Sequence, residues 1–523
     1  MDISTHFSQS APVFHGELVP EAGFIVGYAA IIARLNLPMP VPYPAALVSR
    51  QNKSYQTDKW KVFPNKYLPD DNLGITEIQA LYKHLVFALK YEGVNLLVFC
   101  FLAGHYNESE LTQLVSFEPL GQYSRRIWFL LEWVNGRELK QMNLGARKQY
   151  IPVIDEKLQY AVEGVKSPRH LVINNLPGNP DFCPLIRKTE KLETYIAAQL
   201  SGQKRDYLSE IRKDILLRAS AFLLLKDSKA SFSIEGESPK SSRAARWGHA
   251  IAQAGAHDLT REELIRLQQV VIENERFTEM GFRKKEGFIG EHDRITAEPL
   301  PDHISAKWQD IDVLIDGLVR TTGLLTRSSF DAVLAAAIVA FGFVFIHPFA
   351  DGNGRIHRYL FHHILAKKQF AHQGMIFPVS SSILNHIYQY RKVLESFSLP
   401  LLDFIEWTET KDHNVDVKNN TINYYKFFDS TRQAEFLYDC VKDTLDNIIP
   451  EEIVYLTRYD EFKRYLDDEF EMPDKTVDLL VRFLEQNNGH LSQRAREKEF
   501  VKLSITEIQT IEERFKEIFQ LLG

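Results

Sequence analysis

The sequence predicts a mainly α-helical protein in which a helical core carries a β-hairpin, with a mixed, largely helical region before it and a helical region after it. Three observations lead to this prediction. An unbroken apolar run spans Ala332 to Ile346. Apolar side chains recur every three or four residues in segments on either side of that run, and a glycine-bracketed stretch at 287–290 is typical of a hairpin.

The apolar run, AVLAAAIVAFGFVFI, contains no polar side chain. It is too short to cross a bilayer but suits a helix that is buried on every side. Because a proline disfavours helical geometry in the residue before it, Pro348 is expected to end the helix and leave the His347 ring free at its exit. A second helix is expected from Arg355 to Ala366, with one apolar face formed by Ile356, Leu360, Ile364 and Leu365.

Between these helices lies the segment HPFADGNGRIHR, His347 to Arg358. Its glycines permit positive φ angles and close backbone approach, so the amides of the loop and of the helix start are expected to converge on one anion-attracting point. Arg355 and Arg358 are one helical turn apart and can reach the same polyphosphate. Asp351 offers a hard oxygen ligand for magnesium.

These residue types indicate a reaction class. His347, at the mouth of the loop, can take a proton from an incoming hydroxyl near neutral pH. His357 lies inside the second helix and is interpreted as a packing or surface residue. Because no covalent nucleophile is apparent, we expect direct in-line transfer of a phosphorus group.

The segment resembles the signature of the Fic family, HPFx(D/E)GNGRxxR, and matches it at every fixed position. The resemblance implies a Fic-type helical core and a protein adenylyltransferase, which moves AMP from ATP to a Ser, Thr or Tyr hydroxyl of a target protein while diphosphate leaves. By this likeness His347 is the base and Asp351 the Mg²⁺ ligand. The nucleotide-binding residues would be Gly352, Asn353, Gly354, Arg355 and, for the terminal phosphate, Arg358. The common family version has Thr-Gly where this chain has Ile356-His357.

A second likeness lies earlier in the chain. Residues 231–236 resemble the family's inhibitory signature, (S/T)xxxE(G/N), which here consists of Ser231, Glu235 and Gly236. A short helix over 231–235 would let Glu235 pair with Arg358 and occupy the space of the terminal phosphate, so that ATP binds with its α-phosphate turned away from attack. The alternative is that Glu235 merely caps or solvates a helix end.

The hairpin stretch consists of Gly287, Phe288, Ile289 and Gly290. The resemblance implies a flap over the site, to which a target segment adds as an extra strand. The alternative is an ordinary surface hairpin. A helix is also expected from Ile383 to Phe397, where Tyr388 and Tyr390 could wall the adenine site or simply pack in the core; Tyr390 is the residue assigned to the nucleotide.

Three domains are expected: an N-terminal extension at 1–195, a Fic domain at 196–410 and a C-terminal helical domain at 411–523. The extension could recognise targets or brace the core, and the C-terminal domain could bind a partner or nucleic acid. A proline-rich connector at 38–44 is expected to be extended, and helices are expected from Thr408 onwards, one of them between Pro473 and Asn487-Asn488-Gly489. Further helices are expected at 24–35, 76–91, 125–134, 207–225 and 261–275.

Composition limits the class of protein. A net charge of −7 and a pI near 6.2 argue against a nucleic-acid or membrane-surface binder. Cys100, Cys183 and Cys440 form no CxxC pair and are expected to be reduced thiols. Without a signal-peptide pattern or a membrane span, the chain is expected to be cytoplasmic. The expected partners are ATP with Mg²⁺ and a target protein, but not a membrane, and nucleic acid is not favoured. A homodimer is left open.

Several competing interpretations remain. The histidines near the motif, together with His292-Asp293, could suggest an HD-type metal phosphohydrolase, although that class gives no reason for GNGR. Neither a P-loop motif nor HExxH occurs in the chain. Within the enzyme interpretation, the transferred group could be another nucleotide or phosphate-linked moiety, and Glu235 could instead orient water for removal of AMP. A nucleotide-sensing interaction protein with little turnover is the alternative from a different class.

Overall fold

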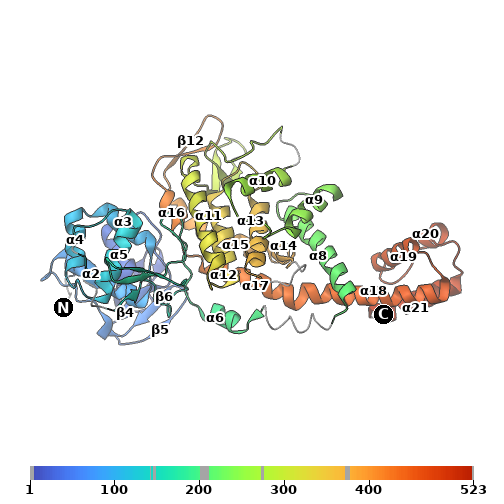
Figure 1. Ribbon diagram of the computed structural model, residues 1–523, viewed down its shortest axis with the longest axis horizontal. Coiled ribbons are helices and arrows are strands. Elements are labelled where there is room, and N and C mark those ends of the chain that lie inside the picture. Colours follow the sequence, from blue (N-terminus) through green and yellow to red (C-terminus); the bar gives the residue numbers. More distant parts are fainter. Residues whose placement is uncertain are drawn as a thin grey trace.

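The computed structural model describes residues 5–141, 143–144, 149–200, 211–272, 276–370 and 377–520. These residues form a mainly α-helical fold with small sheets, which confirms the predicted fold class. An N-terminal lobe packs beside a central helical body, and one long helix leads from that body to a C-terminal helical module (Figure 1). Among the described residues, no helix combines the length and apolarity needed to cross a membrane.

The N-terminal lobe combines a four-stranded sheet and a small two-stranded sheet with five helices. The strand order in the larger sheet is β3-β4-β6-β5; α1 lies between β3 and β4 in the chain, and the other four helices follow the sheet. Its strands are β1 (Val13–Phe14), β2 (Glu17–Leu18), β3 (Gly23–Ile25), β4 (Ala45–Ser49), β5 (Tyr55–Gln56) and β6 (Trp60–Phe63). Its helices are α1 (Gly27–Leu35), α2 (Glu77–Tyr91), α3 (Leu96–His105), α4 (Glu108–Ser116) and α5 (Gln122–Asn135), with a 3₁₀ turn at Asn65–Tyr67. The helix expected at 24–35 therefore starts later, because Phe24 and Ile25 belong to β3.

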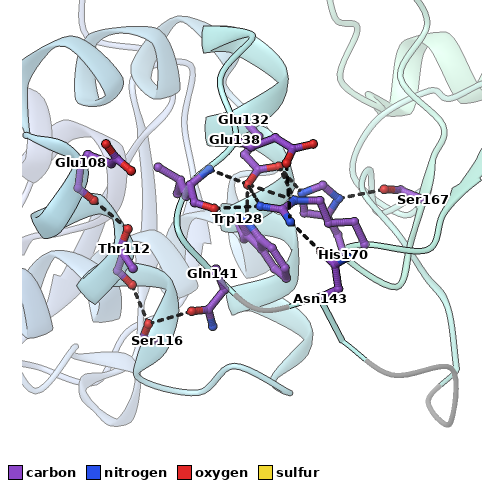
Figure 2. Close-up of polar contacts among 12 residues, drawn as sticks. Glu108, Thr112, Ser116, Trp128, Glu132, Glu138, Gln141, Asn143, Ser167 and His170 are labelled. Carbon is purple, nitrogen blue, oxygen red and sulfur yellow. Dashed lines mark hydrogen bonds and ion pairs between the residues drawn. The ribbon is translucent and has the colours of Figure 1, made fainter.

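A buried carboxylate links the last helix of this lobe to the small sheet that follows it in the chain (Figure 2). Glu132, on α5, accepts hydrogen bonds from Trp128 Nε1 at 2.6 Å and from His170 Nε2 at 2.8 Å, and it pairs with Arg169 at 2.8 Å. Burial alone would raise the pKa of Glu132, but the bonds from Arg169 and its other donors lower it. The charged carboxylate thereby ties α5 to the sheet of β7 (Ile151–Pro152), β8 (Val165–Ser167) and β9 (Val172–Asn174).

The central body is built around α12 (Ala332–Ile346), in which every residue is buried. Asp331 caps its start by accepting hydrogen bonds from the amides of Val333 and Leu334. The helix packs against α11 (Ile311–Arg327), α13 (Asn353–Lys367) and α17 (Thr431–Asp443). Phe182 from the N-terminal region lies so close that a Cβ on Gly342 would be 2.2 Å from its ring. The N-terminal region thus packs directly on the central helix.

Around this core lie α6 (Glu190–Ala197), α8 (Lys213–Ile234), α9 (Ser241–Ala252), α10 (Arg261–Val271), α14 (Val379–Asn385) and α15 (Ile387–Leu402), with a 3₁₀ turn at Trp308–Asp310. Two predictions need correction. The short helix expected at 231–235 is the last turn of the 22-residue helix α8. The helix expected at 383–397 is two helices that meet at His386. Residues 207–210 and 273–275, expected to be helical, lie outside the described residues.

Two hairpins lie on the central body. β10 (Phe288–His292) pairs with β11 (Pro299–Ile304), as predicted, and β12 (Trp407–Glu409) pairs with β13 (Val415–Val417). The prediction of helix from Thr408 onwards is therefore wrong at its start. The helices that follow are α16 (Ile422–Lys426), α17, α18 (Ile449–Phe470), α19 (Asp474–Gln486), α20 (Gln493–Lys498) and α21 (Ile505–Phe519), with a π-helical turn at Thr444–Ile448 between α17 and α18.

The C-terminal module has a hydrophobic core of its own. It contains Phe462 and Leu466 from the end of α18 together with apolar residues of α19 to α21, and it is separate from the main core, which extends to Leu456. Pro473 is the N-cap of α19, and the helix ends at Asn487, as predicted. Helix α18 thus belongs to both cores.

Candidate active site

The candidate site begins where α12 ends. His347 has φ 53°, a left-handed conformation, and its amide donates to Phe343 O at 3.0 Å. The ring is half-buried, and its Nδ1 lies 3.2 Å from Val344 O. Because a carbonyl can only accept, Nδ1 carries the proton and Nε2 has a free lone pair. Burial, followed by the positive charge of Arg283, lowers the pKa of His347 to about 4, so the imidazole is neutral at physiological pH.

The loop after His347 is closed by an amide side chain. Asn353 Oδ1 accepts from Phe349 N at 3.0 Å, and its Nδ2 donates to Phe349 O at 2.8 Å. Gly352 has φ 97°, which L-residues rarely adopt, and it is the N-cap of α13. Among the described residues, no side chain caps that helix start. The first amides of α13 are therefore available to an anion, whereas the Asn353 side chain holds the loop in shape.

Two buried guanidinium groups flank this helix start. Arg355 is 3% exposed and Arg358 is 1% exposed, and both lie on α13 one turn apart. Each is engaged by carboxylates. Arg355 Nη2 lies 2.8 Å from Asp351 Oδ1 and its Nη1 lies 2.8 Å from Glu237 Oε1. Arg358 Nη2 lies 2.7 Å from Glu235 Oε1.

The end of α8 delivers both glutamates. Gly236 adopts φ 74°, the amide of Gly236 donates to Ser233 O, and the amide of Glu237 donates to Phe232 O. This is the Schellman arrangement, which turns the chain back on the helix end. It places two carboxylates, two residues apart, against two arginines that are three residues apart. Arg358 is also held by Ser231, through Oγ at 3.0 Å from Nε and the carbonyl at 2.7 Å from Nη2.

The ionisation of Glu235 follows from these contacts. Burial would raise the pKa of Glu235, but the charge and hydrogen bond of Arg358 outweigh it, with a further contribution from Arg355, and the pKa is lowered. Glu235 is therefore charged at neutral pH, and its carboxylate lies directly on the cationic group that a phosphate would need.

Asp351 is the one candidate for a Mg²⁺ ligand in the motif. Its side chain is half exposed, and Oδ1 accepts from Gly352 N at 2.5 Å and from Arg355. Among the described residues there is no group of three or more His, Cys, Asp or Glu side chains suited to a metal. A single exposed carboxylate beside a phosphate site still suits Mg²⁺, which commonly uses one or two carboxylates plus substrate phosphates and water.

The β10–β11 hairpin lies beside His347. Ser305 N donates to Gly287 O at 2.9 Å, so Gly287 and Ser305 form a hydrogen-bonded pair. In an antiparallel ladder such pairs alternate with pairs that exchange no hydrogen bonds, and Phe288 belongs to the next pair. The N–H and C=O of Phe288 therefore point away from β11. A bulge follows between Ile289 and Gly290, and a Cβ on Gly290 would lie 2.1 Å from Leu300 O. His303 fixes β11 by bonds to Phe345 O and Ser398 Oγ, both 2.9 Å. Within the part of the chain that the structure describes, no hydrogen-bond partner is seen for the outward N–H and C=O of Phe288, so Phe288 lies on an open edge of β10.

The remaining histidines and tyrosines lie in the core or in solvent. His357 is fully buried with its Nδ1 2.7 Å from Ala340 O, and His362 pairs with the buried Asp227 at 3.0 Å. Tyr390 is 4% exposed, stacks on His357 and lies beside Arg358, whereas Tyr388 is 64% exposed. Tyr390 is thus the tyrosine adjacent to the site, and burial raises its pKa to about 12.

Two residues of the site were missed by sequence reasoning. Glu237 follows the inhibitory pattern by one position and could have been weighed as a second carboxylate. Arg283 is buried beneath the hairpin, and nothing in the run Arg283-Lys284-Lys285 distinguishes it from its two exposed neighbours.

The comparison with protein families agrees with the motif, because residues 258–365 match the Fic/DOC family. No curated protein matches the chain significantly. A Fic family protein from Desulfovibrio desulfuricans is 17% identical, with a match covering 64% of this chain and 86% of that one at a TM-score of 0.36. A Fic domain-containing signaling protein from Bacteroides thetaiotaomicron is also 17% identical, covering 50% of this chain and 97% of that one at a TM-score of 0.34.

Proposed function

Because residues 258–365 belong to the Fic/DOC family, we propose that the protein is a protein adenylyltransferase that moves AMP from ATP to a hydroxyl of a target protein and is held at low activity by Glu235. The observation that carries the proposal is the convergence of a neutral imidazole, an uncapped helix start and two buried guanidinium groups. Together these groups can bind a polyphosphate and take one proton beside it.

In the proposed reaction, His347 Nε2 accepts the proton of the target hydroxyl as its oxygen forms a bond to the α-phosphorus of ATP. The bond between that phosphorus and the oxygen bridging to the β-phosphate breaks, and diphosphate leaves with both bonding electrons. The first amides of α13, Arg355 and Arg358 stabilise the phosphate charge. Asp351 would hold Mg²⁺, which supplies further neutralisation of the phosphates when it is bound.

The target is proposed to dock on the outer edge of β10. An extended segment that pairs with the outward N–H and C=O of Phe288 would gain main-chain hydrogen bonds while leaving side-chain selection weak. The turn between β12 and β13 limits this edge, because Asn414 Nδ2 already donates to Glu286 O at 2.8 Å. Pairing would therefore begin at Phe288, the first free position on the edge.

Inhibition follows from the ion pair of Glu235 with Arg358. While this pair is formed, the guanidinium that would hold the terminal phosphate is occupied, and a triphosphate cannot take the pose needed for attack. Separating a partly buried ion pair costs free energy, because each charge is left without its partner. The pair of Glu235 with Arg358 is therefore expected to keep the protein in the low-activity state. The engagement of both arginines also favours a second candidate function, a nucleotide sensor that turns over little.

Incubation with α-labelled ATP and Mg²⁺ separates these functions. Glu235→Gly is expected to transfer label covalently to itself or to proteins of a lysate, while wild type transfers much less. Glu235→Gly with His347→Ala is the control and must lose the label while still binding ATP. Tight ATP binding by Glu235→Gly without any covalent label would support the sensor and contradict the transferase.

A further inference from the structure

A buried arginine connects the flap hairpin to the proposed base. Arg283 is 6% exposed and lies just before β10. Its Nε donates to His347 O at 2.8 Å, its Nη1 to Lys285 O at 2.7 Å, and its Nη2 to Ala306 O and, at 3.4 Å, to Ile346 O. One guanidinium group therefore binds four main-chain carbonyls.

These carbonyls belong to two structural units. Ile346 and His347 are the last residues of α12 and its cap, where carbonyls have no partner within the helix and the helix dipole is negative. Lys285 precedes β10 and Ala306 follows β11, so they mark the two ends of the hairpin. The backbone of Arg283 adds a fifth link, because its amide donates to Pro348 O at 2.9 Å. The planar fork thus fixes the hairpin relative to the loop that carries His347.

We infer that Arg283 is a positioning residue of the transfer reaction, because it holds the main chain of His347 and both ends of the β10–β11 hairpin in one fixed relation. This inference rests on the proposed function. A hydroxyl presented by a strand on β10 can meet His347 Nε2 only if the hairpin and the imidazole keep their mutual register. A lysine cannot replace the guanidinium, because its single ammonium lacks the planar set of donors that reaches carbonyls on both sides.

The charge of Arg283 has a second effect. The charged and titratable groups facing His347 are Arg283 and, with opposite sign, Glu235 and Asp351, while the buried His303 ring lies 6.4 Å away. After burial, Arg283 is the largest influence that lowers the pKa of His347. Loss of its charge should therefore raise the pKa of His347 and move the acidic limb of the rate profile to higher pH, an effect that a purely structural residue would not have.

Two variants of Arg283, both made in the Glu235→Gly background, separate the effect of the planar guanidinium donors from the effect of the positive charge. Arg283→Lys keeps the charge and loses the fork, so kcat is expected to fall by roughly tenfold to a hundredfold with the acidic limb unmoved, as misplacement by about 1 Å typically causes. Arg283→Gln loses both the planar guanidinium and the positive charge. It is expected to lower kcat and also to shift the acidic limb of the rate profile to higher pH. The ATP Kd should change less than about twofold in both, a small free-energy difference, since the carbonyls that Arg283 binds among the described residues lie outside the α13 helix start.

Arg261→Gln is the matched control. The guanidinium of Arg261 lies 5.2 Å from the ring of Phe282, the residue that precedes Arg283 in the chain. It pairs with the carboxylates of Asp312 and Asp316 and not with the carbonyls near His347. It should change neither kcat nor the acidic limb. Hydrogen exchange of residues 287–304 gives a readout that does not need activity: it should accelerate in both Arg283 variants and not in the control.

The outcomes distinguish this inference from the proposed function. If Glu235→Gly transfers no label, the proposed function fails, and hydrogen exchange still tests the link between Arg283 and the hairpin. If Arg283→Lys keeps full kcat and slow exchange, the inference is wrong. Should Arg283→Gln not fold, Arg283→Lys decides alone through the same two measurements.

Discussion

A Cβ atom on Gly354 would lie 2.0 Å from Glu235 Oε1 and 3.3 Å from Arg358 Nη1. The carboxylate of Glu235 therefore occupies the space immediately above the first turn of α13, where the helix amides and Arg358 meet. Any side chain at position 354 would exclude Glu235 from this place. The glycine of the motif thus leaves room for the Glu235 carboxylate, at the place where the proposed function requires a phosphate to approach.

The first prediction concerns the charge and the volume of Glu235. Glu235→Gly removes both, and its affinity for ATP is expected to rise by at least about tenfold, roughly 1.4 kcal/mol, because Arg358 becomes available. Glu235→Gln removes only the charge and should give a smaller increase, since the amide still fills the space above Gly354. Titration calorimetry with ATP and Mg²⁺ measures both. Equal affinities in wild type and both variants would contradict the proposed inhibition.

The second prediction concerns Glu237, whose Oε1 lies 2.8 Å from Arg355 Nη1. It also pairs with Arg243, and the guanidinium groups of Arg243 and Arg355 lie 4.6 and 5.3 Å from the centre of the Phe232 ring. Glu237→Gln in the Glu235→Gly background is expected to raise AMP transfer above that of Glu235→Gly alone, because Arg355 loses a competing anion.

Glu395→Gln, exposed on α15, is the control for the loss of one negative charge. A slower transfer in the double variant, with unchanged thermal stability, would instead mean that Glu237 orients Arg355 for the reaction.

The third prediction tests the free edge of β10. Phe288→Pro removes the outward N–H and leaves the ladder to β11 intact, because proline is tolerated where the amide faces away from the sheet. Labelling of lysate proteins by the Glu235→Gly chain is expected to fall by at least about fivefold, roughly 1 kcal/mol and the worth of one main-chain hydrogen bond, with ATP affinity unchanged.

Phe288→Ala is the matched control, since it removes the ring and keeps the N–H. If both variants label the lysate equally, main-chain pairing at Phe288 does not contribute to target docking.

The fourth prediction concerns acid stability. Burial lowers the pKa of His357 and of His303 to about 3, and the pKa of His363 to about 4. Because the ordinary histidine pKa is near 6.5, the unfolded chain binds more protons than the folded chain below that pH. The free energy of unfolding should therefore decrease as the pH falls from about 6.5 towards 4.

His357→Leu is expected to make this decrease shallower, even though it leaves Ala340 O without its partner and costs about 1 kcal/mol at every pH. Chemical denaturation at several pH values between 4 and 8 measures the slope. An unchanged slope would show that His357 is not neutral in the folded protein at low pH.

Elements could be predicted correctly from the sequence where composition, helix caps and turn residues all indicate the same structure. The bounds of α12 follow from fifteen apolar residues between Asp331, which caps the helix, and the dipeptide His347-Pro348, which ends it. The first strand of the β10–β11 hairpin was predictable from Phe288 and Ile289, whereas β11, which contains Pro299 and Pro301, has no strand signal of its own. The motif also predicted that the arginines would share one helix face, since residues three apart in a helix always do.

The rest depended on partners far away in the chain. The sequence prediction ended one helix at 225 and began a separate short helix at 231, yet Asp227, Ser228 and Ser231 lie buried inside the single helix α8. They are tolerated there because His362, Ala244 O and Arg358 satisfy them, and these partners come from other elements. The charged turn at 410–414 was read as helix because charge alone does not distinguish an exposed hairpin from an exposed helix.

Helix α8, which ends beside Glu235, also packs against α18, the helix that leads to the C-terminal module. Arg218 of α8 pairs with Asp460 of α18 at 2.6 Å, and its guanidinium lies over Tyr459. Helix α8 therefore contacts α18 near its start and carries Glu235, which pairs with Arg358, at its end. Any change in the tilt of α18 would therefore be expected to act on the position of Glu235 through this contact.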